Sequence, residues 1–143
     1  MSITFTVPGN PQGKARARTF YNQKLGRSQS ITPEKTVLYE NLVKQCFTAN
    51  CDCGFFDKEP LVMMVIAYFP IPKSTTKKDR GLIAEGLLYP TKKPDADNIA
   101  KVICDALNGV AYGDDTQIVN LTVIKEYTDE EPRVEVYIDN IEI

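Results

Sequence analysis

The sequence predicts a single α+β domain, residues 1–143, in which a mixed sheet is covered by helices. Short stretches of alternating or continuous apolar residues predict strands. Two longer stretches with apolar residues at every third or fourth position predict helices. The order of these elements along the chain is β-α-β-α-β-β. A chain of 143 residues is also long enough to bury a proper core of its own.

The first half of the chain is expected to hold one strand, a long polar segment and one helix. Residues 3–7 alternate apolar side chains with threonines, which predicts a half-buried strand. Residues 10–31 are polar and basic and predict a loop, and loops of this length in a compact domain are usually functional or disordered. The basic residues interleaved with Phe20 and Tyr21 favour a function. Thr32 as N-cap and Pro33 as first helical residue open a helix that extends to about Ala49. The apolar positions expected on its buried side are Val37, Leu38, Leu42, Val43, Cys46 and Phe47.

The next segments predict a strand and a second basic loop. Residues 61–69 form an unbroken apolar run that ends at Pro70, as expected of a central strand buried on both faces. Residues 73–80 are basic, and the stretch onward to Pro90 is expected to be irregular with at most a helical turn.

The last third predicts a helix followed by two strands. The helix is expected from about Asp97 to Asn108, with Gly109 in the left-handed position that closes a helix. Its buried stripe comprises Ile99, Val102, Ile103, Ala106 and Leu107. Residues 117–127 and 133–138 then predict strands joined by a hairpin loop, with Val134, Val136 and Ile138 facing inward.

Composition excludes several classes of chemistry. The chain has no histidine, which removes an imidazole base, a Ser-His-Asp triad and a His-ligated zinc. Cys46, Cys51 and Cys53 do not have the C-x2-C zinc spacing and Cys104 is isolated, so reduced structural thiols are expected, with a zinc site or redox pair as the alternative. The chain shows no signal-peptide pattern and no apolar run near the ~20 residues of a membrane helix, so we expect a cytoplasmic protein without membrane contact.

Charge is distributed unevenly although the net charge is only −2. Residues 1–33 contain five basic residues and no acid, whereas the chain from Glu126 onward is rich in acids. Such asymmetry predicts one face for a polyanion and another turned away from it.

The most informative segment is residues 93–115, KPDADNIAKVICDALNGVAYGDD. It holds five acids around one predicted helix: Asp95, Asp97, Asp105, Asp114 and Asp115. Two like charges about 4 Å apart repel by roughly 4 kcal/mol even at an effective dielectric constant of about 20. A bound divalent cation would turn this repulsion into attraction. The segment therefore predicts a metal site.

Spacing supports this prediction. Asp97, Lys101 and Asp105 share one face of the helix because positions four apart are neighbours. Glycines at 109 and 113 allow the chain to return, so that one of the last two acids can rejoin the first pair. Carboxylate oxygens suit Mg²⁺ or Mn²⁺, and the helix N-terminus favours a nearby anion such as a phosphate. Lys101 could stabilise charge on a scissile phosphate or orient the attacking water, and metal-assisted hydrolysis needs no protein base.

Each acid also has a simpler interpretation. Asp97 could be only the N-cap of the helix. Lys101 and Asp105 could form no more than an exposed ion pair, or Asp105 could orient a neighbouring group. The two consecutive acids Asp114 and Asp115 could be ordinary turn residues.

The segment K-P-D-A-D-N-I-A-K-V-I-C-D-A-L-N-G, followed after two residues by Y-G-D-D-T-Q-I-V, resembles the RusA family of Holliday junction resolvases. These are homodimeric bacterial and prophage endonucleases that cut four-way DNA junctions with Mg²⁺. The resemblance is closest over Lys93–Val119 and weaker over VPGNPQGKARAR and TPEKTVLYE. It implies that Asp95, Asp97 and Asp115 are metal ligands and that Lys101 is the catalytic lysine. Residues expected to support them are Asn98, Asp105 and Asp114.

Basic residues are expected to neutralise DNA phosphates, which would make affinity fall steeply with salt. The candidates are Lys14, Arg16, Arg18, Lys24, Arg27, Lys73, Lys77, Lys78, Arg80 and Lys93. Phe20 or Tyr21 could stack on unpaired bases at the branch point. The alternative is that both basic segments are only solvated surface.

These observations together predict a Mg²⁺-dependent, structure-selective DNA endonuclease that resolves Holliday junctions by paired phosphodiester hydrolysis in recombination and repair. A four-way junction has two symmetry-related strands, which suits the homodimer that the resemblance implies. Two alternatives remain open. One is a less selective nuclease for branched or flap DNA, and the other is a non-catalytic junction-binding protein whose acids hold a structural cation.

Overall fold

A four-stranded mixed sheet forms the centre of the computed structural model, which describes residues 1–51 and 54–141. Its strands lie in the order β1 (Ser2–Pro8), β6 (Arg133–Asn140), β4 (Leu61–Pro70) and β5 (Ile118–Thr128). β4 and β5 run parallel, whereas β6 runs antiparallel to both of its neighbours. The mixed sheet and the α+β class that the sequence predicts are therefore confirmed.

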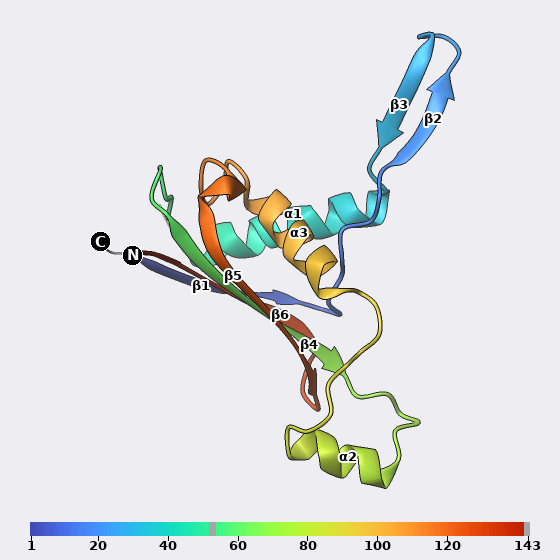
Figure 1. Ribbon diagram of the computed structural model, residues 1–143, viewed down its shortest axis with the longest axis vertical. Helices are drawn as coiled ribbons and strands as arrows, with labels where there is room; N and C mark the ends of the chain where they lie inside the picture. The colour runs from blue at the N-terminus through green and yellow to red at the C-terminus, as the bar shows by residue number, and fades with distance from the viewer. Residues whose placement is uncertain (52–53, 142–143) are drawn as a thin grey trace.

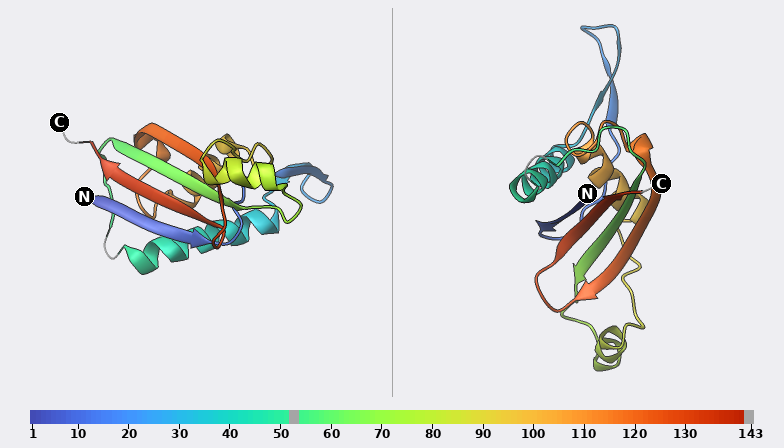
Figure 2. Two further views of the ribbon diagram at one scale, coloured as in Figure 1. Left: turned by 90° about the horizontal axis from the view of Figure 1, so that it is seen from below. Right: turned by 90° about the vertical axis from the view of Figure 1, so that its left-hand side faces the viewer.

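Helices α1 (Glu34–Asn50) and α3 (Ala96–Leu107) cover one face of this sheet and pack against each other (Figure 1; Figure 2). The core lies between the two layers. Strand residues that face the helices are buried: Ile3, Phe5, Val7, Leu61, Met63, Val65, Ala67, Phe69, Val134, Val136 and Ile138. Each strand in this set buries every second residue, because side chains alternate between the two faces of a sheet.

Helix α3 follows the predicted apolar stripe closely. All five predicted positions are buried, and Gly109 has a φ of +74°, the left-handed conformation that favours glycine after a helix. The helix begins at Ala96, and Asp95 rather than Asp97 occupies the N-cap position. The simple interpretation of Asp97 as an N-cap is therefore wrong.

Two predictions about the sheet need correction. β4 is central, but it is not buried on both faces: Met64 points away from the helices and is 39% exposed. β5 and β6 are not a hairpin, because β4 lies between them in the sheet. The short connection after Thr128 passes over the end of β4 instead, a topology that strand patterns alone do not encode.

Helix α1 also differs from its prediction at the N-terminus and on its buried side. It begins at Glu34 with Pro33 in the N-cap position, so Thr32 does not cap it. Val37 and Leu38 are 41% and 61% exposed. The residues that are buried along this helix are Thr36, Tyr39, Val43 and Phe47. They recur at three- and four-residue spacing. Because the first buried residue is a threonine, the apolar pattern of the sequence does not show which side of the helix is buried at its start.

Two elements lie where loops were expected. β2 (Arg18–Asn22) and β3 (Arg27–Ile31) form a hairpin, and α2 (Lys77–Ala84) is a short helix whose first turn is capped by the Thr76 hydroxyl. The hairpin and α2 project at opposite ends of the long axis of the molecule (Figure 1). Neither contains a buried residue, so neither has the apolar pattern by which a sequence reveals an element.

Cys46 and Cys104 are free thiols, and burial raises the pKa of Cys104 to about 11, as expected of an unreactive structural cysteine. Cys53, which belongs to the predicted cysteine cluster, lies outside the described residues. Across residues 1–51 and 54–141, no helix combines the length and apolar character that crossing a bilayer requires.

Candidate functional site

The first pair of acids is presented at the N-terminus of α3. Asp95 has extended backbone (φ −71°, ψ 153°) at the N-cap position, and its carboxylate makes no capping hydrogen bond to the helix. Asp97 lies in the first turn, and both side chains are exposed. Their backbone is fixed because the Ile99 N–H donates to the Asp95 carbonyl at 3.0 Å and the helix beyond is buried. The backbone that carries both carboxylates is thus fixed, and the carboxylates are accessible to a cation.

The second pair of acids, Asp114 and Asp115, lies in a turn that hydrogen bonds of the Gln117 side chain stabilise. The Gln117 side-chain oxygen accepts from the N–H groups of Gly113 and Asp114 at 2.9 and 3.0 Å. Its amide nitrogen donates to the carbonyls of Phe56 and Glu59. Asp114 and Gln117 thereby form a reciprocal capping box for the short 3-10 helix of residues 115–117. The D-x-x-Q spacing is a sequence signal that could have identified Gln117.

Two further hydrogen bonds join this turn to α3. The Asn108 side-chain oxygen accepts from the Asp115 N–H at 3.0 Å, and the buried Tyr112 hydroxyl donates to the Cys104 carbonyl at 2.8 Å. Asn108 is the C-cap residue of α3, so the helix end and the acid turn are joined directly. The chain thus turns back to the C-terminal end of α3, the end opposite to Asp95 and Asp97.

Electrostatic coupling shows which charged groups the fold brings together. Burial raises the pKa of Asp115, and the neighbouring Asp114 and Asp105 raise it further, whereas Lys101 acts in the opposite direction. Hydrogen bonds from Asp115 and from the Thr116 hydroxyl lower the pKa of Asp114. Asp115 therefore lies within electrostatic range of Asp105 and Lys101 on α3. The predicted approach of Asp115 to Asp95 and Asp97 stays a prediction.

Lys14 occupies a different role from a free DNA-binding cation. Its ammonium group lies 3.1 Å from a Glu40 carboxylate oxygen and 3.3 Å from an Asp105 carboxylate oxygen. These partners raise the Lys14 pKa even though burial lowers it. The ion-pair partner of Asp105 in the structure is thus Lys14, and Lys14 ties the N-terminal loop to both α1 and α3.

The same loop passes unusually close to the start of α3. The Lys14 N–H donates to the Asn98 carbonyl at 2.9 Å. A Cβ atom at Gly13 would lie 2.9 Å from the Asn98 Cβ and 3.0 Å from the Pro94 Cβ, a separation that real side chains do not adopt. Gly13 is required by this close approach, which depends on tertiary structure and left no signal in the sequence.

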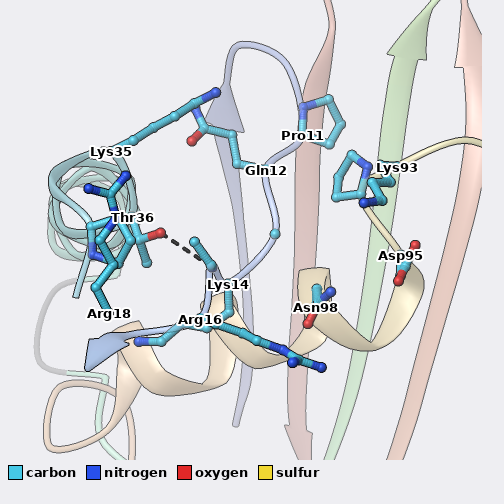
Figure 3. A pocket seen from close by; sticks show the side chains of 14 residues that line it. Pro11, Gln12, Lys14, Arg16, Arg18, Lys35, Thr36, Lys93, Asp95 and Asn98 are labelled. Carbon is cyan, nitrogen blue, oxygen red and sulfur yellow. Dashed lines mark hydrogen bonds between the residues drawn. The ribbon is translucent and has the colours of Figure 1, made fainter. Parts of the chain in front are cut away.

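A cleft of about 800 Å³ opens between this loop, the start of α1 and the segment before α3 (Figure 3). Its basic lining consists of Lys14, Arg16, Arg18, Lys35 and Lys93. Asp95 and Asn98 line the same cleft, so a carboxylate from the candidate site lies beside the cations. Lys35 was not among the predicted residues, because the sequence places it on a helix but does not show that the start of this helix borders the cleft.

The remaining predicted cations do not line this cleft. Lys24 and Arg27 are on the hairpin, whereas Lys73, Lys77 and Lys78 are near α2 at the other end of the molecule (Figure 1). The Arg80 guanidinium donates to backbone carbonyls of its own loop, those of Pro72, Lys73 and Thr75, at 3.2 to 3.4 Å. The structure therefore separates the two basic segments instead of joining them in one track on a single chain.

The predicted metal site has suitable donor groups, but these groups are not arranged around one point. Among the residues that the structure describes, no three acidic or cysteine side chains are arranged as a ready set of metal ligands. Asp95, Asp97 and Asp115 are thus not drawn together around one point, as a bound cation would draw them. The chemistry of the donors, three aspartate carboxylates, fits a hard divalent cation. The metal site stays a prediction.

A core helix flanked by aspartates lies beside a cleft lined by cations, an arrangement whose charge suits an anionic ligand such as a phosphate. The family model described as endodeoxyribonuclease RusA matches residues 8–139, and the chain belongs to this family. A relative from Bacillus subtilis (strain 168), named uncharacterized protein YqaN, is 38% identical over 141 residues, which cover 97% of this chain and 96% of the relative. The predicted family is confirmed, and with it the class of enzyme, a nuclease that acts on DNA.

Proposed function

We propose that this protein is a Mg²⁺-dependent endonuclease that resolves Holliday junctions by paired cuts during DNA recombination and repair. One observation carries the proposal beyond family membership. Asp95 and Asn98 line the same cleft as Arg16, Arg18 and Lys93. A DNA phosphate attracted by these cations would lie beside the N-terminus of α3, where the helix dipole and backbone N–H groups also favour an anion.

The proposed ligands of the cation are Asp95, Asp97 and Asp115, with Mn²⁺ able to replace Mg²⁺. When bound, such an ion polarises the phosphate and activates the attacking water. Asp95 suits this role because its carboxylate is not used to cap α3, whereas the turn that carries Asp115 is hydrogen-bonded to the other end of the same helix. Bringing the three carboxylates to one cation would require the turn that carries Asp115 to move towards the first pair of acids.

Lys101 is proposed to stabilise negative charge on the phosphate in the transition state. It is exposed on the helix face that carries Asp97 and Asp105, one turn from each. Asp105 is held by Lys14, so it serves to fix the position of the N-terminal loop and to add negative potential around Asp115. We propose that Asn98 and Asp114 support the ligands. The Asn98 carbonyl accepts from the Lys14 N–H, and Asp114 caps the turn that carries Asp115.

A homodimer is proposed because a four-way junction presents two equivalent strands. A two-fold dimer would bring two copies of the cleft to these strands, and the cuts would be symmetric. The dimer is carried over from the family resemblance, and its test is the oligomeric state of the protein in solution, measured by sedimentation.

The test of the function is a cleavage assay on a synthetic four-way junction, a linear duplex and a flap, each with Mg²⁺ and with EDTA. Paired symmetric nicks on the junction in Mg²⁺ alone would support the proposal. Comparable cutting of the flap would favour a less selective nuclease. Binding of the junction without any cutting would favour a non-catalytic binder.

The matched variants are Asp97→Asn and Asp79→Asn. Both residues are acids in the first turn of a helix, one at the candidate site and one on the distant α2. We expect Asp97→Asn to abolish cleavage while junction affinity remains, and Asp79→Asn to cut like the parent protein. Substantial residual cutting by Asp97→Asn would count against its role as a ligand.

A further inference from the structure

The hairpin of β2 and β3 is an element without a visible structural purpose. Its side chains are exposed or half-buried throughout, including Tyr21 at 63%, Ile31 at 54% and Phe20 at 41% exposure. It stands clear of the sheet and of both core helices (Figure 1; Figure 2). A two-stranded hairpin with no packed face is marginally stable in water. An element that exposes aromatic and aliphatic side chains in this way is expected to gain contacts from a partner.

The hairpin is nevertheless well organised at its tip. The Asn22 side-chain oxygen accepts from the N–H groups of Lys24 and Leu25 at 3.0 and 3.3 Å, and Gly26 takes a left-handed φ of +64°. The Asn22 amide nitrogen donates to the Gln29 side chain at 2.9 Å across the two strands. These bonds set the turn and the strand register, and the register decides which side chains share a face.

The strand register divides the hairpin into two unlike faces. Residues opposite each other in an antiparallel pair point to the same side. One face, which we call the arginine face, consists of Arg18, Phe20, Asn22, Arg27, Gln29 and Ile31. The other face carries the small hydroxyl residues Thr19, Ser28 and Ser30 together with Tyr21. Phe20 is therefore flanked by guanidinium groups, whereas Tyr21 is not.

Charge identifies the kind of partner that fits this face. The hairpin and its turn contain Arg18, Lys24 and Arg27 and no acid. A second copy of the same hairpin would bring the same positive charge to a two-fold interface and would be repelled. A polyanion with flat apolar groups is complementary, and single-stranded or unpaired DNA has both phosphates and base faces.

The hairpin is also connected to the candidate site. Arg18, at its base, lines the cleft that contains Asp95 (Figure 3). From this base the five-residue strands extend roughly 17 Å, at about 3.4 Å for each residue. DNA held with a phosphate in the cleft would therefore have its neighbouring nucleotides within reach of the arginine face.

We propose that the arginine face of the hairpin docks at the branch point of a DNA junction, with the Phe20 ring stacked on a base that is unpaired there. Arg18 and Arg27 contact the phosphates on either side of this base. The hairpin thereby supplies selectivity for branched over linear DNA, because a fully paired duplex offers no free base face. This inference rests on the proposed function, since it takes a DNA junction as the substrate.

The test uses junctions with 2-aminopurine either at the branch point or in the middle of one arm, bound in EDTA so that no cutting occurs. Three variants are compared with the parent protein: Phe20→Ala, the control Tyr21→Ala on the opposite face, and a chain in which two glycines replace residues 19–30. Because Arg18 and Ile31 are opposite each other, this short link closes the strands without strain. Junction and duplex affinities are measured in parallel.

We expect the parent protein to change the fluorescence of the branch-point probe and not that of the arm probe. Phe20→Ala should lose this signal and bind the junction about tenfold or more weakly, the loss typical of one base–aromatic stack. Tyr21→Ala should retain the signal. The shortened chain should bind junction and duplex almost equally while melting like the parent protein.

The inference is overturned on its own if the parent protein binds and cuts junctions and Phe20→Ala does the same with an unchanged probe signal. It is also overturned if Tyr21→Ala causes the larger loss, or if the shortened chain changes from dimer to monomer, which would make the hairpin a subunit contact. If the parent protein neither binds nor cuts junctions, the proposed function fails and the inference falls with it.

Discussion

Helix α3 and the β2–β3 hairpin are the two regions on which the functional account depends, and they are built in opposite ways. Seven of the twelve residues of α3 are buried, and its acids sit at the ends and on the one face that remains exposed. The hairpin buries none of its residues and lies outside the core. The acids are thus carried by a rigid element, whereas the hairpin presents cations and aromatic rings on a support with few stabilising contacts.

This difference matches two different chemical demands. Groups that act on a scissile phosphate must be held to within a fraction of an ångström, and packing in the core provides this rigidity. Groups that grip a flexible polymer gain from an element that can adapt and whose order is completed by the partner. The N-terminal loop, through Gly13 and Lys14, is the physical connection between the two regions.

The largest effect is expected at the acid turn. Asp115→Asn should lower the rate of junction cleavage by at least about a hundredfold, because loss of groups that only support metal ligands already costs about 10–100-fold. Asp114→Asn is the matched control, since asparagine retains the capping role of Asp114 in the turn. Single-turnover rates of the two variants decide the assignment, and equal losses would contradict it.

Lys101 is expected to have the next largest effect. Lys101→Gln removes a charge proposed to stabilise the transition state, a kind of loss that costs about a hundredfold. The variant should bind the junction with nearly the parent affinity, because the basic cleft is unchanged. Control Lys44→Gln, at an exposed position of α1, should cut normally. A loss of affinity that equals the loss of rate would assign Lys101 to DNA binding instead.

Gly13→Ala tests the connection between the two regions. The new Cβ would meet Asn98 and Pro94 at 2.9 and 3.0 Å, so the loop must move or the site must distort. Overpacking of this kind costs about 1–3 kcal/mol of unfolding free energy, and we expect slower cleavage as well. Gly81→Ala, in a helix with open space around it, should be neutral or slightly stabilising. Urea denaturation compares the two, and equal stability would show that the close approach is not maintained.

The smallest effects are expected from substitutions at Arg16 and Lys14. They should show which of the two residues contacts a DNA phosphate and which stabilises the fold. Arg16 is exposed and is expected to contact one phosphate, so Arg16→Gln should lower the dependence of log affinity on log salt by about 1 without changing stability. Lys14→Gln leaves Glu40 and Asp105 without their cation and should destabilise the fold instead. Salt titrations and thermal melts on both variants provide the comparison, and a reversed pattern would show that Lys14 is the phosphate contact.

The same contrast explains what the sequence could predict. Buried elements leave a periodic apolar pattern, so α3, β1 and β6 were predicted with nearly their true bounds. The hairpin and α2 bury nothing and were predicted as loops. The D-x-D-N and D-D spacings predicted a metal site around this helix, and the structure places the two groups of acids at opposite ends of α3.

Other site features depend on contacts between distant segments. Gly13 is required only because the loop crosses α3, and Lys35 matters only because α1 begins at the edge of the cleft. The pairing of Lys14 with Glu40 and Asp105 joins three separate elements. The order of β5 and β6 around β4 likewise depends on the whole sheet. No local pattern reports such contacts.

The most direct test of the account is a crystal of the protein soaked in Mn²⁺ and measured for anomalous scattering. The account predicts a peak within coordination distance of the carboxylates of Asp95, Asp97 and Asp115, and the loss of this peak in Asp97→Asn. A protein that cuts junctions but whose manganese binds elsewhere, or in contact with none of these three side chains, would contradict it.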